Sequence, residues 1–382
     1  MHQKILYFNQ KHLDHPEISN FLDAHYDYPW DLFKELNKFF NSMPAIYPRV
    51  GINGLPFKND VANLSGFDMP RYDNSFSRNF QEVTDQRCLE LRSSKFNRPW
   101  IVYYSGGIDS TVMVCSIIKN LPKADWKNIT IACNSSSIYE YPEFYFKFIL
   151  PNFTVTNSNR IYNQPFSDSN WYIDGEFGDQ LYGGGEHTLS LTANNPELLH
   201  CDIVRDAGKL IGFLKSRTNQ RFAEWYYHLM LDNIRSVDLP LETFNDFFWW
   251  GFFNYSWISV KFRPLFDKNK RQLNHVKTYL DTHISWYDNR DYQLWSMINN
   301  IKHRDHQKNI GDFKKHSKNF IYEVTKDTYY RIFKIKTGST SISVPSNVSV
   351  ISEDLETFDL ANDIDQILRI LPHHLNIKRK YS

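Results

Sequence analysis

The motif Ser-Gly-Gly-Ile-Asp-Ser at residues 105–110 lies where a strand-like segment passes into a helix-like one. Residues 100–104 (WIVYY) are β-branched and aromatic, which is typical of a buried strand, and residues 110–119 (STVMVCSIIK) carry apolar residues at helical spacing. The two glycines permit a tight turn that brings backbone N–H groups close to a bound anion. The helix adds its unpaired N–H donors and the positive end of its dipole. The motif therefore predicts a phosphate-binding loop.

Asp109 places a carboxylate at the start of the same helix. A carboxylate next to a bound polyphosphate indicates a hard divalent cation, most simply Mg2+, that bridges the two. In the simpler interpretation, Ser105 or Asp109 only caps the helix after a glycine turn. The complete motif lies directly between a strand-like and a helix-like segment, and this argues against that interpretation. The chain has neither Gly-x-x-x-x-Gly-Lys-Ser/Thr nor Gly-x-Gly-x-x-Gly, so kinase-like transfer of a γ-phosphate is disfavoured.

This loop resembles that of the N-type ATP pyrophosphatases, which is written Ser-Gly-Gly-x-Asp-Ser. Asparagine synthetases, β-lactam synthetase, the GMP and NAD synthetases and some tRNA-modifying enzymes share it, and all of them split ATP between its α and β phosphates. The loop alone does not choose among these enzymes.

A second motif, residues 174–184 (DGEFGDQLYGG), follows the strand-like residues 171–173. It is similar to the asparagine synthetase signature Ser-Gly-Glu-Gly-Ala-Asp-Glu-Leu-Phe-Gly-Gly. A glycine-rich acidic loop by itself is more often a surface turn, but its pairing with the upstream loop favours this family. The residues that match are Gly175, Glu176, Asp179, Leu181, Gly183 and Gly184.

Four positions depart from the signature: Asp174 replaces Ser, Phe177 replaces Gly, Gly178 replaces Ala, and Gln180 replaces the second acidic residue. Phe177 puts a large ring where the family keeps only backbone. The shape of the acceptor pocket is therefore left open.

The resemblance implies a site and a reaction. Asp109 and Asp179 would hold Mg2+ over the pyrophosphate, and Glu176 would act near the acceptor, with a role as base left open; these three are the candidate catalytic residues. A carboxylate would attack the α phosphorus of ATP, pyrophosphate would leave, and an amine would displace AMP from the acyl adenylate. The implied ATP-binding residues are Tyr104, Ser105, Gly106, Gly107, Asp109, Ser110 and Gly175.

The nitrogen donor is a separate question. Glutamine-dependent asparagine synthetases begin with a processed N-terminal cysteine on a glutaminase domain, whereas here Met1 precedes His2 and only about 100 residues precede the loop. We therefore expect no glutaminase domain. The nitrogen would come from ammonia, from an amine, or from a separate glutaminase, and the acceptor would be a small carboxylate.

Composition narrows the remaining classes. With 44 basic and 43 acidic residues the net charge is +1, so no overall field favours nucleic acid or an anionic membrane as partner. The four cysteines include no Cys-x-x-Cys pair, and Cys115 and Cys133 fall in apolar segments, where we expect buried, reduced thiols. Without a signal peptide or an apolar run of about 18 residues, we expect a cytoplasmic protein.

The predicted fold is α/β: a parallel sheet with crossover helices, similar to the adenine nucleotide alpha hydrolases, followed by a mainly helical C-terminal region. Ligands in such sheets bind at the carboxyl ends of the strands. Expected strands are 100–104, 129–133, 154–156 and 171–173, and expected helices are 79–94, 110–119, 141–150, 223–237, 241–260 and 288–301. The expected regions are 1–95 (partly helical), 96–190 (the ATP-pyrophosphatase core), 191–318 (helical), and 319–382, with a β-hairpin at 319–336 and a closing helix at 355–371.

Two other functions stay open. An enzyme with the same loop could adenylate a nucleobase or tRNA, although this would require a basic face that the balanced charge does not indicate. A non-enzymatic structural or partner protein could retain the fold, although the presence of Asp109, Glu176 and Asp179 argues against it.

Overall fold

The computed structural model describes most of the central part of the 382-residue chain. The long described ranges are 69–162, 166–183, 186–257, 281–302 and 313–334. Short described pieces are 4–6, 16–17, 20, 24, 31–32, 35, 49, 164, 260, 278–279 and 350–352. The predicted closing helix at 355–371 lies outside the described residues.

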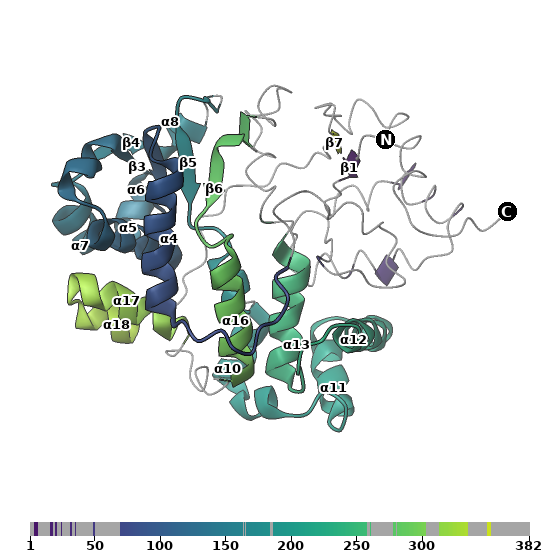
Figure 1. Ribbon diagram of the computed structural model, residues 1–382. Coiled ribbons are helices and arrows are strands. Elements are labelled where there is room, and N and C mark those ends of the chain that lie inside the picture. Colours follow the sequence, from purple (N-terminus) through teal and green to yellow (C-terminus); the bar gives the residue numbers. More distant parts are fainter. Residues whose placement is uncertain are drawn as a thin grey trace.

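A five-stranded sheet, in which all pairs of neighbouring strands are parallel, forms the centre of the protein (Figure 1). Its order is β4-β3-β2-β5-β6. This confirms the prediction of an α/β protein with a parallel sheet; β6 was not predicted. The strands are β2 (Trp100–Tyr103), β3 (Ile129–Cys133), β4 (Thr154–Asn157), β5 (Trp171–Asp174) and β6 (His283–Ser285). A separate antiparallel pair joins β1 (Lys4–Leu6) to β7 (Val350–Ser352).

The strand order places a switch point beside β2. From β2 the chain proceeds to β3 and β4 on one side, and it then returns to add β5 and β6 on the other side. Connections therefore diverge between β2 and β5, and at such a point the carboxyl ends of neighbouring strands leave a crevice in open α/β sheets. Both glycine-containing motifs follow these two strands.

Helix α5, which follows β2, is packed among other helices. Helix α4 begins with a capping box, in which the Glu82 N–H donates to Asn79 Oδ1 (3.0 Å) and the Asn79 N–H donates to Glu82 Oε2 (2.8 Å). The apolar residues of α5 are buried almost without interruption from Val112 to Ile117, because α4 and α17 both pack against it. These helices are α4 (Phe80–Lys95), α5 (Ile108–Asn120), α16 (Arg290–Lys302) and α17 (Lys315–Thr325).

Shorter helical pieces connect the strands. The predicted helix at 141–150 is a single turn, α7, that continues as a π-helix, η3. The pieces are η2 (Lys123–Asn128), α6 (Ser135–Glu140), α7 (Pro142–Phe144), η3 (Tyr145–Ile149), α8 (Ser158–Tyr162) and α9 (Gly178–Tyr182).

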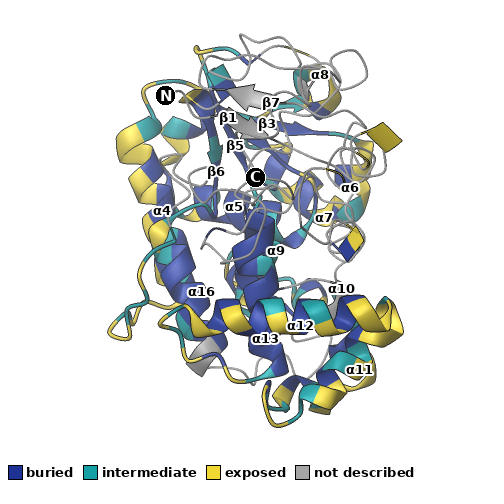
Figure 2. Cartoon of the chain, turned by 90° about the vertical axis from the view of Figure 1, so that its right-hand side faces the viewer, coloured by how far each residue is buried: buried dark blue, intermediate teal, exposed yellow. Residues whose placement is uncertain are grey.

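A second group of helices lies between β5 and β6 in the sequence. Every residue of α13 is buried, whereas α11 and α12 each have an exposed face (Figure 2). Trp249, Trp250 and Trp257 are at most 1% exposed, so these aromatic rings belong to the core. The group consists of α10 (Glu186–Asn194), η4 (Pro196–His200), α11 (Ala207–Arg217), α12 (Gln220–Arg235), α13 (Phe244–Trp250) and the π-helix η5 (Gly251–Tyr255).

The predicted β-hairpin at 319–336 is wrong. This segment forms the end of α17 and the short helix α18 (Thr328–Phe333). The turn between them does lie where it was expected: Lys326 ends α17 in a left-handed conformation (φ 58°), and the side chain of Asp327 caps α18 by accepting from the Tyr330 N–H at 2.8 Å.

Candidate functional site

Two loops lie side by side at the carboxyl ends of β2 and β5. Val102 pairs with Ile173 in parallel register, so the strands end at nearly the same level. The first loop, Ser105–Gly107, leads into α5, and the second, Gly175–Phe177, leads into α9. The structure therefore brings together the two motifs that the sequence placed about 70 residues apart.

The first loop is closed by its serines. The Ser105 and Ser110 hydroxyls lie 3.0 Å apart, and the Gly107 N–H donates to Ser105 Oγ at 3.3 Å. Gly106 has a φ of 79°, and a Cβ atom there would lie 2.3 Å from the Ser137 carbonyl oxygen on α6. Glycine is required at position 106 for both reasons.

Tyr104 and Gly175, two of the residues that the resemblance implies for ATP binding, border this loop. The Tyr104 N–H donates to the Ala132 carbonyl at 2.9 Å, so it is used by the sheet. Gly175 packs on the first turn of α5, because a Cβ atom there would lie 3.0 Å from the Ser110 nitrogen. Tyr104 thus has only its carbonyl group to offer, and Gly175 sets how closely the two loops approach.

Asp109 and Asp179, the predicted metal ligands, converge on the ammonium group of Lys314. Lys314 Nζ lies 2.7 Å from Asp179 Oδ1 and forms a second ion pair with Asp109 Oδ2. The lysine side chain is only 3% exposed, whereas those of Asp109 and Asp179 are 21% and 36% exposed. Two carboxylates from the first turns of different helices therefore point at one cation position, which a lysine from a third segment occupies.

Two properties of Lys314 accompany its position between the carboxylates: its charge and its backbone conformation. Burial alone lowers the pKa of Lys314, but the carboxylates of Asp109 and Asp179 outweigh it, so the pKa lies above its ordinary value and the group is an ammonium ion. Lys314 also immediately precedes α17 in a left-handed conformation with a φ of 54°. Such backbone is costly for a residue with a Cβ atom and concentrates at functional sites. Lys314 was not predicted as a site residue, because no motif surrounds it.

Two further contacts fix Asp109. The Tyr287 hydroxyl, from the turn after β6, donates to the Asp109 carbonyl at 3.0 Å. A Cβ atom on Gly178 would lie 2.3 Å from the Asp109 carboxylate. The replacement of the signature's Ala by Gly178 therefore lets the carboxylate lie directly against the start of α9.

Glu176, the candidate base, is half-buried on the second loop. Its N–H donates to Asp174 Oδ1 at 3.1 Å, and the other oxygen of that carboxylate, Oδ2, lies 2.8 Å from His283 Nε2 on β6. The His283 side chain is 2% exposed and stacks on the ring of Tyr279, with centroids 4.3 Å apart. Neither Asp174 nor His283 was predicted as a site residue.

Phe177 occupies the place of a signature glycine and keeps a glycine-like backbone, with a φ of 76°. Its ring is 1% exposed and stacks on Trp257 at a centroid distance of 4.4 Å. The guanidinium group of Arg49 also lies over the Trp257 ring, 4.3 Å from its centroid. The large ring therefore points into the core of the helical region, and the conformation of the loop is retained at the cost of a strained residue.

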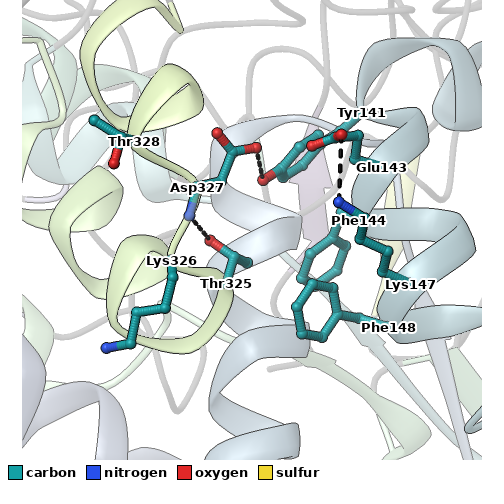
Figure 3. A pocket seen from close by; sticks show the side chains of 9 residues that line it. All are labelled: Tyr141, Glu143, Phe144, Lys147, Phe148, Thr325, Lys326, Asp327 and Thr328. Carbon is teal, nitrogen blue, oxygen red and sulfur yellow. Dashed lines mark hydrogen bonds and ion pairs between the residues drawn. The ribbon is translucent and has the colours of Figure 1, made fainter.

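A separate cavity of about 370 Å³ lies between η3 and the α17–α18 turn (Figure 3). Its charged lining consists of Glu143, Lys147, Lys326 and Asp327, so the signs balance. The Tyr141 hydroxyl donates to Asp327 Oδ2 across it at 2.8 Å. None of the predicted site residues lines this cavity, and its balanced charge does not suit a polyphosphate.

Within the described residues, no group of three or more His, Cys, Asp or Glu side chains could hold a metal ion by itself. Two carboxylates at the site are consistent with a cation that takes its remaining ligands from a nucleotide. In the same part of the chain, no helix is both long and apolar enough to cross a bilayer.

Comparison of the chain with protein-family models, with curated proteins and with solved structures found no match.

Proposed function

We propose that this chain is an ATP-dependent, AMP-forming ligase of the asparagine synthetase type, built on a sheet of the adenine nucleotide alpha hydrolase kind. It would adenylate a small carboxylate and form an amide with ammonia or an amine. The observation that carries the proposal is the convergence of Asp109 and Asp179, from the first turns of the helices that follow the two loops, on one cation position. Such a pair, next to a glycine loop at a helix N-terminus, suits a nucleotide whose pyrophosphate is the leaving group.

The residues have separate tasks in this proposal. The N–H groups of Gly106 and Gly107 and the start of α5, a helix of 13 residues, would bind the β and γ phosphates. Lys314 would supply a buried positive charge beside them, which stabilises the negative charge that develops on departing pyrophosphate. Glu176, half-exposed beside the switch point, would accept a proton from the attacking amine.

Asp109 and Asp179 form a donor set that fits Mg2+, since hard carboxylate oxygens are its preferred protein ligands and phosphates supply the others. When bound, Mg2+ compensates the charge of the pyrophosphate. Because Lys314 Nζ lies between the same oxygens, the lysine must shift towards the phosphates for both cations to act together.

The test is to incubate the purified protein with ATP, MgCl2, a panel of carboxylic acids, and either ammonium or glutamine. AMP and pyrophosphate should form with ammonium, and glutamate should not be released from glutamine. Products limited to ADP and phosphate would refute the assignment. Glutamate release would contradict the expected nitrogen donor.

The matched variants are Asp109→Asn and Asp85→Asn. Asp109→Asn should lower AMP formation about 100-fold or more, because the site loses one of two converging carboxylates while its shape is retained. Asp85 lies on α4 and pairs with Lys119 away from the site, so Asp85→Asn should leave the rate unchanged. Equal rates for both variants would show that Asp109 has only a structural role.

A non-enzymatic protein that retains the fold is the second candidate. It is favoured by the Lys314 ammonium group, which forms ion pairs with both carboxylates without any ligand. ATP binding without AMP release, for every acid and nitrogen source, would support this candidate over the ligase.

A further inference from the structure

The last residue of β5 connects the second loop to the edge strand of the sheet. Asp174 is 8% exposed, and its carboxylate divides its two oxygens between two elements. Oδ1 accepts from the Glu176 N–H at 3.1 Å, which fixes the turn, and Oδ2 lies 2.8 Å from His283 Nε2 on β6. Because a carboxylate only accepts hydrogen bonds, His283 Nε2 carries the proton between them.

The turn requires such support. Residue 177 is a phenylalanine in the left-handed region (φ 76°), so the segment from Gly175 to Phe177 adopts a conformation that costs about 1–3 kcal/mol for a residue with a Cβ atom. A strained turn persists only when its surroundings fix it. The Asp174–Glu176 hydrogen bond lies within this turn, one residue before Phe177.

Several contacts fix His283. It is 2% exposed, stacks on Tyr279, and lies opposite Tyr172 in the parallel register of β5 and β6. The Trp286 N–H, three residues further along, donates to the Asp174 carbonyl at 2.8 Å. The orientation of the Asp174 carboxylate is thus determined by β6 and by the residues that follow it.

We propose that Asp174 and His283 are a positioning pair, in which His283 orients Asp174 and Asp174 holds the turn that presents Glu176 to the acceptor. The role in catalysis rests on the proposed ligase function. His283 lies on β6, and its contact with Asp174 is the link through which it acts on the turn. In this respect the chain departs from the signature, which has serine at position 174.

The test compares two amides of different length. His283→Gln places an N–H donor near the position of Nε2, whereas the side chain of His283→Asn is one methylene shorter and does not reach Asp174. Ser285→Ala is the control, because Ser285 lies on the same strand at 2% exposure and its hydroxyl has no hydrogen-bond partner among the described residues.

The first measurement is hydrogen exchange of the Glu176 amide, followed by mass spectrometry of peptides that contain residue 176. Exchange should be about 10-fold faster in His283→Asn than in the wild type, and near the wild-type rate in His283→Gln and Ser285→Ala. This readout requires no activity. Equal exchange in both amide variants, or failure of both to fold while Ser285→Ala folds, would overturn the positioning pair.

The second measurement is the rate of AMP formation. His283→Asn should lower kcat about 10-fold while the KM for ATP stays within about 2-fold, and His283→Gln should restore kcat. If the wild type forms no AMP, the ligase function fails, and the exchange data still decide whether the pair holds the turn. If exchange changes as expected but kcat does not, the turn is held by the pair and has no role in the reaction, which overturns the proposal.

Discussion

In the absence of a ligand, Asp109 and Asp179 both form ion pairs with Lys314. Removal of one partner from a buried ion pair typically costs about 3–5 kcal/mol, because the remaining charge is left without compensation. Here Asp109 and Asp179 are 21% and 36% exposed, so water screens part of that cost. The lysine therefore serves as an internal counter-ion for a site that otherwise attracts a cation.

We expect Lys314→Met to lower the free energy of unfolding by about 1–3 kcal/mol in buffer without divalent cations. Millimolar MgCl2 should recover part of this loss, because Mg2+ then binds to the two carboxylates that the lysine has left, and it should hardly affect the wild type. Urea unfolding with and without MgCl2 measures both effects. Lys315→Met is the control, since Lys315 is exposed. An Mg2+ response of equal size in wild type and Lys314→Met would contradict the competition.

Phe177 combines a strained backbone with a well-packed ring. Its left-handed φ of 76° favours glycine, whereas the stack on Trp257 favours the aromatic ring. Loss of a buried Phe ring costs about 3–5 kcal/mol, more than the strain that glycine would relieve. Packing therefore outweighs backbone preference at this position.

Both Phe177→Ala and Phe177→Gly should thus destabilise the protein, but Phe177→Gly should be the more stable of the two by about 1 kcal/mol. In a helix or strand the order would be reversed, because alanine is favoured there. Denaturant unfolding of the two variants checks the order. A more stable Phe177→Ala would show that residue 177 does not adopt the left-handed conformation.

At the scale of elements, strands and helices with strong local sequence signals were predicted well. Strand β3 was predicted with its observed bounds, and α4, α5, α12 and α16 each begin and end within a few residues of expectation. These segments have clear apolar patterns, and α4 and α12 also begin with asparagine caps, so the local pattern and the tertiary environment agree. Strand β6 was not predicted, because a three-residue strand of His, Ile and Ser has no distinctive pattern of its own.

Helices α17 and α18 show where the local signal was ambiguous. The sequence NFIYEVTKDTYYRIFKIK is rich in β-branched and aromatic residues, which favour strands, yet residues 319–325 and 328–333 within it are helical. Packing of α17 against α5 and α4 buries Phe320 and Ile321 and decides the outcome. Intrinsic propensity is weak against burial of this kind.

The candidate site shows the same difference between strong and weak local signals. Its two loops could be predicted because each motif is contiguous and follows a recognisable strand. Lys314 and His283 could not, because they reach the site from segments about 100 residues or more beyond the second motif and have no motif of their own. A pair of converging carboxylates favours a nearby cation, but the sequence offers 44 basic residues and does not say which one.

For the whole molecule, the high aromatic content determines how the protein responds to alkaline pH. Burial raises the pKa of Cys88 to about 12 and raises that of Cys115 well above its ordinary value. Burial also raises the pKa values of the tyrosine hydroxyls at 104, 182, 279, 287 and 330 well above the ordinary value. Each of these groups is neutral in the folded protein and becomes charged more readily in the unfolded chain.

The sign of the pH effect follows from this difference. A raised pKa in the folded state means that the group's contribution is fully present below its unfolded pKa, about 8.5 for Cys and 10 for Tyr, and is lost as pH rises towards the folded value. Each group then removes about 1.4 kcal/mol of stability per pH unit in that window. We therefore expect the free energy of unfolding to fall from about pH 9 upward, and more steeply above about pH 10 as the tyrosines contribute.

Two measurements on the same samples test this expectation. Urea unfolding between pH 7 and pH 11 gives the free energy, and tyrosinate absorbance near 295 nm reports ionisation directly. The tyrosinate signal of the buried residues should appear only together with unfolding, and return to pH 7 should restore the folded state. Because 23 tyrosines are present, a gradual titration of all of them with a pKa near 10, without loss of structure, would show that the buried hydroxyls ionise in place and would contradict the predicted coupling.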